Sequence, residues 1–342
     1  MPRKFWTSYN ALVANYSANQ NVTQFTYPAG FWTEGTLITA APSGTNLIAM
    51  SIGAATIGNA RCLKTSYGGN AVVPITCTNG VWSAGSSVTL AAAGSPSHLG
   101  ISLDGVHGIV ACDNTSTVGA VKFNTLTGLW TSNGYVSLTE SNLTNIAITP
   151  DGLRGICVPK TSGFAYPLFR DPGTDVWSVG PRINLGSSST RFFSISMDPT
   201  GTVCLIGSNT AGVNADVLHW DGSVWTRSDV TQVFAASRWL SDGTSVLTVS
   251  GGISTHELKV LNYDPGTKTF SLSQTIVVAG ITGQLWGISV PELGRQDIAI
   301  AVASGSNVLV PFSRVAGSWS AGTLISSVNF NTPMASVIMP LL

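Results

Sequence analysis

Histidines are few in this sequence, and they stand far apart from one another. The four are His98, His107, His219 and His256. The residue four places after His256 is Val260, so the pair His256–Glu257 does not extend into the H-E-x-x-H motif of zinc proteases. The sequence also has no G-x-S-x-G nucleophile motif, no P-loop and no dinucleotide-binding glycine motif. It therefore predicts no catalytic residues.

Cysteines and turn aspartates are the next candidates, as metal ligands. The cysteines are Cys62, Cys77, Cys112, Cys157 and Cys204, an odd number without a C-x-x-C pair. This pattern favours buried free thiols that pack as small apolar side chains. Aspartates recur in turn sequences at Asp104, Asp151, Asp198 and Asp242, where turn chemistry explains them without a cation. No metal site and no cofactor are predicted.

Isolated carboxylates leave one route to catalysis open. Glu34, Glu140, Asp216 and Glu292 could form an active site if the fold brought them together, which the sequence alone does not show. The sequence therefore favours a non-enzymatic protein.

Internal repeats explain most of the remaining conspicuous residues. Large aromatic side chains recur at intervals of 45 to 50 residues, at Trp32, Trp82, Trp130, Trp177, Trp225, Phe270 and Trp319. Segments such as Ile101–Gly105 and Ile148–Gly152 recur in phase with them. Each unit contains short apolar runs separated by Gly, Asn, Asp and Pro, which is typical of strands joined by tight turns. We interpret the periodic aromatic residues as packing between repeats, in preference to ligand-stacking platforms.

Four-stranded antiparallel units of this length, repeated seven times, predict an all-β, seven-bladed β-propeller. We expect residues 1–342 to form a single propeller domain. The C-terminal segment 334–342 has no downstream partners, and the N-terminal segment, about 1–38, resembles the three outer strands of a repeat. The two segments are therefore predicted to share one blade, with the C-terminal inner strand closing the ring so that no sheet edge stays open.

A ligand site, if one exists, should lie where the inner strands meet the central channel. Arg191 and Arg238 are predicted to begin inner strands, and Trp239 and Trp286 place large rings beside them. The four residues are candidates for a cationic and aromatic channel mouth that binds a sugar or a peptide. The alternative is that they only line and plug the channel.

Composition limits the partners. Sixteen basic residues balance sixteen acidic ones, and only 9% of residues are charged, against about 25% in typical globular proteins. A nucleic-acid partner is therefore not predicted. Membrane insertion is not predicted either, because no apolar run approaches the roughly 18–20 residues of a spanning helix. The N-terminal segment lacks the apolar stretch of a signal peptide.

The low charge combined with no apparent signal peptide favours a virion or another extracellular particle, with the cytoplasm as the alternative. The partners would be other protein subunits of such an assembly and a cell-surface glycan.

The period and the Ser-x-Asp-Gly inner-strand motif resemble the WD40 and YVTN-type propeller superfamilies over essentially the whole chain, at the level of the fold. The Trp-Asp pair of WD40 repeats occurs once, at Trp220–Asp221. A lactonase-type propeller would imply an enzyme, but no residue set carries over. A propeller lectin would imply repeated sugar sites, which the irregular loops do not favour.

Three hypotheses follow: a structural or adhesion component of a virus or phage particle, which we favour; a carbohydrate-binding lectin; and a propeller hydrolase or lactonase.

Overall fold

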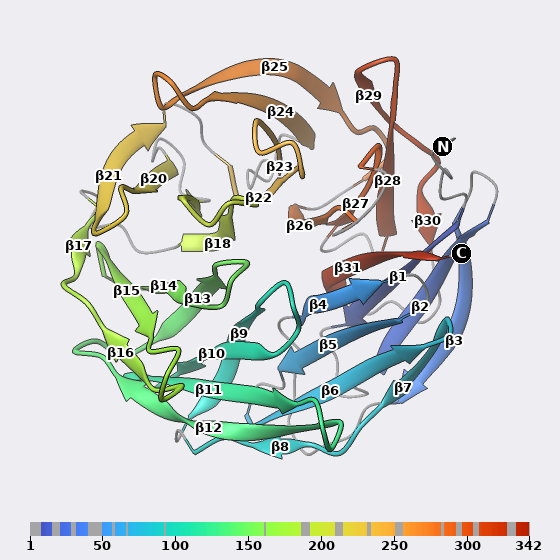
Figure 1. The fold of residues 1–342 in the computed structure, drawn as a ribbon. Coiled ribbons are helices and arrows are strands. Elements are labelled where there is room, and N and C mark those ends of the chain that lie inside the picture. Colours follow the sequence, from blue (N-terminus) through green and yellow to red (C-terminus); the bar gives the residue numbers. More distant parts are fainter. Residues whose placement is uncertain are drawn as a thin grey trace, which may run out of the picture.

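Seven antiparallel sheets stand in a ring around a central channel (Figure 1). The computed structural model describes residues 8–15, 21–28, 32–39, 50–56, 59–65, 68–91, 94–160, 162–185, 192–208, 215–230, 234–249, 256–281, 284–291, 296–303, 308–326 and 333–341. In these segments the regular structure is entirely strand, and no helix there is long and apolar enough to cross a membrane. The prediction of a seven-bladed β-propeller is confirmed.

Each blade runs from an inner strand beside the channel to an outer strand at the rim. The closing blade contains β31 (Pro333–Leu341), β1 (Ser8–Asn15), β2 (Asn21–Pro28) and β3 (Thr33–Thr39). Blade 1 contains β4 (Met50–Thr56), β5 (Asn59–Thr65), β6 (Ala71–Thr78) and β7 (Val81–Ala84), with β8 (Val88–Thr89) also pairing with β6. Blade 2 contains β9 (Ser95–Ile101), β10 (His107–Asp113), β11 (Thr117–Asn124) and β12 (Leu129–Ser137).

Blades 3 to 6 repeat this order. Blade 3 contains β13 (Leu143–Ile148), β14 (Arg154–Pro159), β15 (Phe164–Arg170), β16 (Trp177–Val179) and β17 (Ile183–Asn184). Blade 4 contains β18 (Phe192–Met197), β19 (Val203–Ser208), β20 (Ala215–Trp220) and β21 (Trp225–Val230). Blade 5 contains β22 (Ala236–Trp239), β23 (Ser245–Val249), β24 (Glu257–Asp264) and β25 (Thr269–Val277). Blade 6 contains β26 (Leu285–Ser289), β27 (Ile298–Ala303), β28 (Val308–Val315), β29 (Ser318–Ala321) and β30 (Ile325–Ser326).

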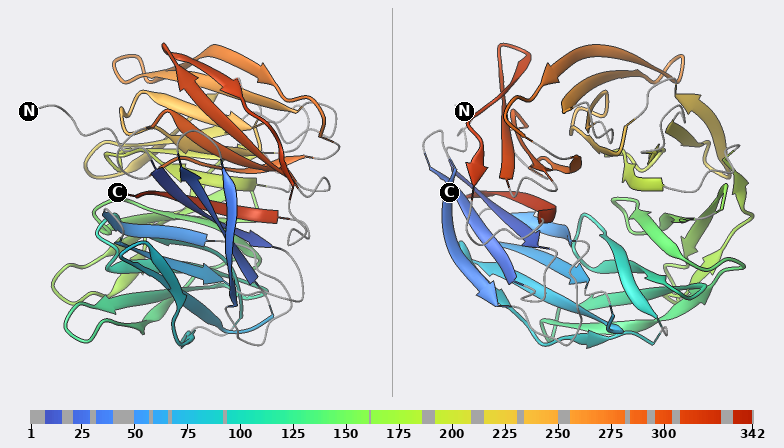
Figure 2. Two further views of the ribbon diagram at one scale, coloured as in Figure 1. Left: turned by 90° about the vertical axis from the view of Figure 1, so that its right-hand side faces the viewer. Right: turned by 180° about the vertical axis from the view of Figure 1, so that it is seen from behind.

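The two ends of the chain close the ring together, as the sequence predicted. β31 pairs antiparallel with β1, in a register that sets Leu12 opposite Val337 and Ser8 opposite Leu341. Figure 1 and both views of Figure 2 show the red strand β31 beside the blue strands of the N-terminal segment. The inner edge of the N-terminal sheet is thereby paired, and an open edge that could recruit another chain is removed.

Turns at the inner end of the blades depend on the recurring aspartates. The Asp104 carboxylate accepts a hydrogen bond from the Val106 amide at 2.9 Å, and the Asp151 carboxylate accepts one from the Leu153 amide at the same distance. Gly105 and Gly152 take φ of 66° and 68°, a region that glycine enters at little steric cost. These aspartates are therefore turn residues, as predicted.

Apolar side chains fill each of the seven interfaces between blades. The periodic tryptophans belong to these cores and are 3–9% exposed: Trp32, Trp82, Trp130, Trp177, Trp225 and Trp319. Phe270, which replaces tryptophan in blade 5, packs partly buried against the interface of blades 4 and 5. Packing between repeats is therefore the role of the periodic aromatic residues.

Candidate functional site

The central channel contains a cavity of about 410 Å³, lined by the inner strands of blades 1 to 6. It extends from the middle of these strands to the Asp-Gly turns at one end of the ring. A concave, mostly apolar space with a few converging polar groups is the usual form of a small-molecule site. The cavity is therefore the candidate functional site of the described part of the chain.

Serine hydroxyls in the channel wall fasten neighbouring inner strands to one another. The Ser194 hydroxyl accepts a hydrogen bond from the Ser237 amide at 3.2 Å, and the Ser196 and Ser237 hydroxyls are bonded to each other at 2.7 Å. On the other side of the ring, the Ser51 hydroxyl accepts a hydrogen bond from the Ile101 amide at 3.1 Å. These hydrogen bonds connect neighbouring inner strands, so the serine hydroxyls have less hydrogen-bonding capacity left for a ligand.

His98 lines the end of the cavity away from the Asp-Gly turns. Strand register places it at the position that Asn145 and Ser194 occupy in the next two blades, and all three line the cavity. Its Nδ1 is buried and has no hydrogen-bond partner in the described structure. Burial, and then the positive charge of Arg238, lower the pKa of His98 to about 4. The imidazole is therefore neutral at ordinary pH.

Arg238 comes from β22 and lines the same cavity, partly exposed. Among the four residues predicted to form the channel mouth, it is the one with a described, charged side chain in the channel wall. Trp239, the next residue, also borders the cavity but is only 5% exposed, and its ring packs edge-on against Tyr263 and Phe270, at 5.5 and 5.8 Å between centroids. Its role here is mainly to fill the interface between blades 4 and 5.

The side chains of the other two predicted mouth residues are not among those that the structure describes. Arg191 lies outside the described residues, and Trp286 is described as part of β26 without its side chain. The prediction that the four residues bind a ligand together stays a prediction. Sequence reasoning missed His98, because its chemical partner Arg238 is 140 residues away. Aligning the inner strands of the repeats could have indicated that His98 lines the channel, since His98, Asn145 and Ser194 occupy the same position in successive strands.

The isolated carboxylates considered from the sequence do not come together. Asp216 is 2% exposed in β20 and accepts a hydrogen bond from Arg227 Nε at 2.6 Å. Glu140 lies 3.6 Å from an Arg182 guanidinium nitrogen, and Glu34 is exposed on β3. None of these three lines the channel cavity, and Glu292 lies outside the described residues. The three described carboxylates therefore do not form an active site with one another.

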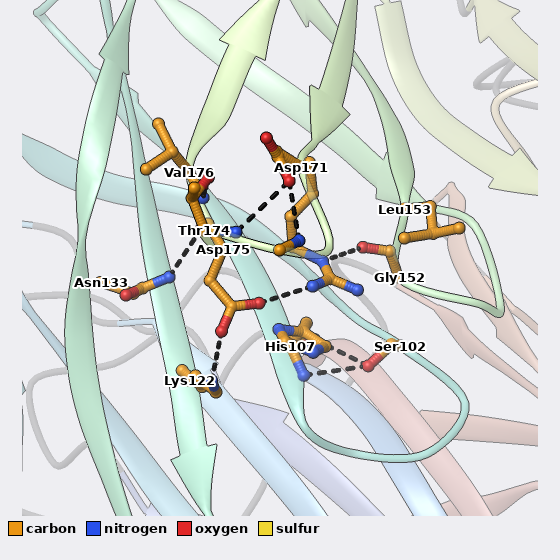
Figure 3. A network of polar contacts seen from close by, with 12 residues as sticks. Ser102, His107, Lys122, Asn133, Gly152, Leu153, Asp171, Thr174, Asp175 and Val176 are labelled. Carbon is orange, nitrogen blue, oxygen red and sulfur yellow. Dashed lines mark hydrogen bonds and ion pairs between the residues drawn. The ribbon is translucent and has the colours of Figure 1, made fainter.

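A second polar cluster joins blades 2 and 3 (Figure 3). The Asp175 carboxylate accepts hydrogen bonds from Lys122 of β11 and, at 2.6 Å, from Arg170 of β15. Asn133 of β12 donates to the Asp175 carbonyl at 3.0 Å, and Arg170 also donates to the Gly152 carbonyl at 2.8 Å. Lys122 first, and Arg170 after it, hold the pKa of Asp175 below its ordinary value.

The contacts drawn in this cluster are all made between groups of the protein (Figure 3). Asp175 also adopts a positive φ of 59°, which fixes its carboxylate between the two blades. Because the Asp175 carboxylate pairs with cations from both blades, Lys122 and Arg170, we interpret the cluster as a clamp between blades 2 and 3 and not as a ligand site.

The five cysteines are buried and free, as predicted. Burial raises the pKa of the Cys62 thiol to about 12 and those of the Cys77 and Cys112 thiols to about 11. Such thiols stay protonated at neutral pH and are poor nucleophiles. The cysteines therefore contribute to core packing and not to catalysis.

The fold and channel define a seven-bladed β-propeller with a partly open cavity in its central channel, lined by both polar and apolar side chains. No protein-family profile matches the sequence, and no curated protein matches it. Solved structures do share the fold. The Pseudomonas aeruginosa periplasmic gluconolactonase PpgL has 13% sequence identity and a TM-score of 0.71, over 97% of this chain and 99% of that one.

Two further solved structures are similar. A Bacteroides uniformis protein provisionally named a 6-phosphogluconolactonase has 11% identity and a TM-score of 0.74, over 97% of this chain and 100% of that one. A functionally unknown protein from Desulfotomaculum acetoxidans has 13% identity and a TM-score of 0.76, over 98% of this chain and 99% of that one. At such identities the likeness establishes the fold.

These comparisons correct the favoured functional hypothesis. The structural neighbours are bacterial proteins, several of them named as lactonases, so the prediction of a virus or phage component in a virion or extracellular particle is wrong. The prediction of a non-enzymatic protein is not supported either. The error came from inferring a location from the low charge and the lack of an apparent signal peptide. Part of the low charge belongs to the fold, since strands β19, β23 and β27 are buried along their whole length and contain no charged residue.

Proposed function

We propose that this protein hydrolyses uncharged cyclic esters, or lactones, in the central cavity. The observation that carries the proposal is His98, a neutral histidine with a buried Nδ1 that lacks a hydrogen-bond partner, lining one cavity with the cationic Arg238. The fold shared with proteins named as lactonases supports the same reaction class.

The reaction needs a base for water and a positive group for the developing negative charge. His98 accepts a proton from a water molecule as the water oxygen bonds to the lactone carbonyl carbon. The Arg238 guanidinium stabilises the carbonyl oxygen as it becomes negatively charged. The ring C–O bond then breaks, and the proton held by His98 passes to the departing ring oxygen. The product is a hydroxy acid, and the only co-reactant is water.

The charge of the cavity favours an uncharged substrate. Arg238 and Asp198 are the charged side chains among its described lining residues. The Asp198 carboxylate already accepts hydrogen bonds from the Thr202 and Val203 amides, both at 2.6 Å. A single guanidinium would compensate a phosphorylated substrate poorly, since a phosphate carries close to two negative charges.

The proposal is tested by measuring δ-valerolactone hydrolysis in a pH-stat with the wild-type protein and its variants. We expect kcat/KM to fall by a factor of about 100 to 10,000 in His98→Asn, as for loss of a general base. Arg238→Gln should lower it by a factor of about 100 to 1,000.

His256→Asn is the matched control. His256 also has a buried ring nitrogen without a hydrogen-bond partner in the described structure, but it does not line the cavity. Its variant should keep wild-type activity. An inactive wild-type protein, or a His98→Asn variant as active as wild type, would show that the proposal is wrong.

A further inference from the structure

The end of the cavity at the Asp-Gly turns differs in chemistry from the end that contains His98. Four inner turns place a side chain at the same point, immediately after the residue whose amide closes the turn: Leu103, Pro150, Pro199 and Ser241. Pro291, which follows β26, lines this end as well. We name Leu103, Pro150, Pro199 and Pro291 the apolar collar.

The collar is part of the fixed frame of the ring. The Leu103 amide donates a hydrogen bond to the Pro150 carbonyl at 2.9 Å, which joins the turns of blades 2 and 3. Pro199 follows Asp198, whose carboxylate is held by turn amides. Leu103 remains 47% exposed, although its turn is fixed. An exposed leucine in a rigid ring of prolines is a preorganised apolar contact surface.

Arg238 and His98 line the cavity at a distance from the collar. Along an inner strand, Arg238 is three residues from the collar position, or about 10 Å at 3.3 Å per residue, and His98 is five residues from it, or about 16 Å. Met197 lies between them and the collar and lines the cavity too. A ligand that fills the cavity therefore meets His98 and Arg238 at one end and the apolar collar at the other.

From this gradient we infer that the substrate is a lactone with an alkyl side chain, its ring held by His98 and Arg238 and its chain lying against the apolar collar. The inference rests on the proposed function and specifies its substrate class. A polyhydroxylated sugar lactone fits less well, because its hydroxyl groups would need several open hydrogen-bonding partners. The wall serines Ser51, Ser194 and Ser196 already bond to neighbouring strands.

The test compares three substrates: δ-dodecalactone, which has a heptyl chain; unsubstituted δ-valerolactone; and glucono-δ-lactone. We expect kcat/KM to be highest for δ-dodecalactone, by about tenfold or more over δ-valerolactone, because methylene contacts in an apolar site discriminate by factors of this size. Faster hydrolysis of glucono-δ-lactone would overturn the inference while leaving lactone hydrolysis in place.

Variants of the collar identify the surface responsible. In the double variant Leu103→Ser/Pro199→Ser the ratio of kcat/KM for δ-dodecalactone to that for δ-valerolactone should fall about tenfold. The control is Leu126→Ser, the same substitution at a leucine that is 95% exposed on the turn between β11 and β12. The control should keep the wild-type ratio, and a double variant that also keeps it would overturn the inference.

Binding separates this inference from the proposed function. The dissociation constant of the lactam analogue of δ-dodecalactone, measured by calorimetry, should rise about tenfold in the double variant. If no lactone is hydrolysed but this binding difference is found, the ligand class stands and the hydrolase proposal fails. If the lactam does not bind to the wild-type protein, the inference is wrong.

Discussion

The lowered pKa of His98 predicts how the stability of the fold depends on pH. An unfolded histidine has a pKa of about 6.5, and the folded value is about 4. Between these values the unfolded chain binds a proton at this residue and the folded protein does not. Stability is therefore unaffected by His98 above about pH 6.5, falls as the pH drops from 6.5 to 4, and levels off below that as the folded protein is protonated too.

The size of the effect follows from the same two values. At about 1.4 kcal/mol for each pKa unit, His98 lowers the free energy of unfolding by at most about 3 kcal/mol at pH 4 relative to pH 7. His107 and His219 also have lowered pKa values, caused first by burial, so they add to the wild-type pH dependence in the same direction. A variant is needed to isolate the His98 contribution.

His98→Asn isolates it, because Asn145 already occupies the equivalent position in the next blade. Free energies of unfolding are measured by urea denaturation from pH 7 to pH 4 for both proteins. We expect the difference between wild type and variant to change with pH, the variant losing up to about 3 kcal/mol less. Two parallel curves would refute the reasoning, because they would show that His98 has an ordinary pKa in the folded protein.

Three further predictions concern the ring. Deleting residues 334–342 uncovers β1 side chains such as Leu12 and Val13, which are fully buried, and each should cost roughly 1.5–3 kcal/mol of folding free energy. The truncated protein should therefore unfold or aggregate, which size-exclusion chromatography would detect. Deleting Leu342 alone should have no effect. Asp175→Asn should lower the free energy of unfolding by about 1–3 kcal/mol, since two cations lose their carboxylate; an unchanged denaturation midpoint would show that the clamp is not stabilising. Gly53→Ala places a Cβ 2.4 Å from the Ser102 carbonyl oxygen and should lower the free energy of unfolding by about 1–3 kcal/mol. In the control Gly35→Ala the nearest atom is 3.4 Å from the new Cβ, so its free energy of unfolding should stay within about 0.5 kcal/mol of wild type. Equal melting temperatures for the two variants would contradict the close approach of blades 1 and 2.

The fold could be predicted because its signals are local and repeated. Each Asp-Gly turn and each anchor tryptophan identifies one blade, and seven copies outweigh any single ambiguous segment. The burial of the middle strands follows from their apolar runs. Gly108–Cys112 is such a run, and β10 is buried on both faces because it packs between two neighbouring blades.

The site was less predictable, because it depends on distances across the ring. Arg238 was found because it lies at the start of an inner strand, whereas His98 has no neighbouring residue in the sequence that hints at chemistry. Lys122 and Asp175 likewise pair across a blade interface that no short motif encodes. In a closed ring such pairings depend on the order of the blades and on their register, and both follow from the packing of the whole chain.

The central claim, that His98 and the channel receive a lactone, is tested most directly by histidine side-chain NMR. The chain has only four histidines, so each imidazole signal can be assigned by substitution. The protein is titrated with δ-valerolactam, an analogue that resists hydrolysis. We predict that the His98 signal shifts with saturation while the His256 signal stays in place; a titration in which the His98 signal does not move would contradict the account.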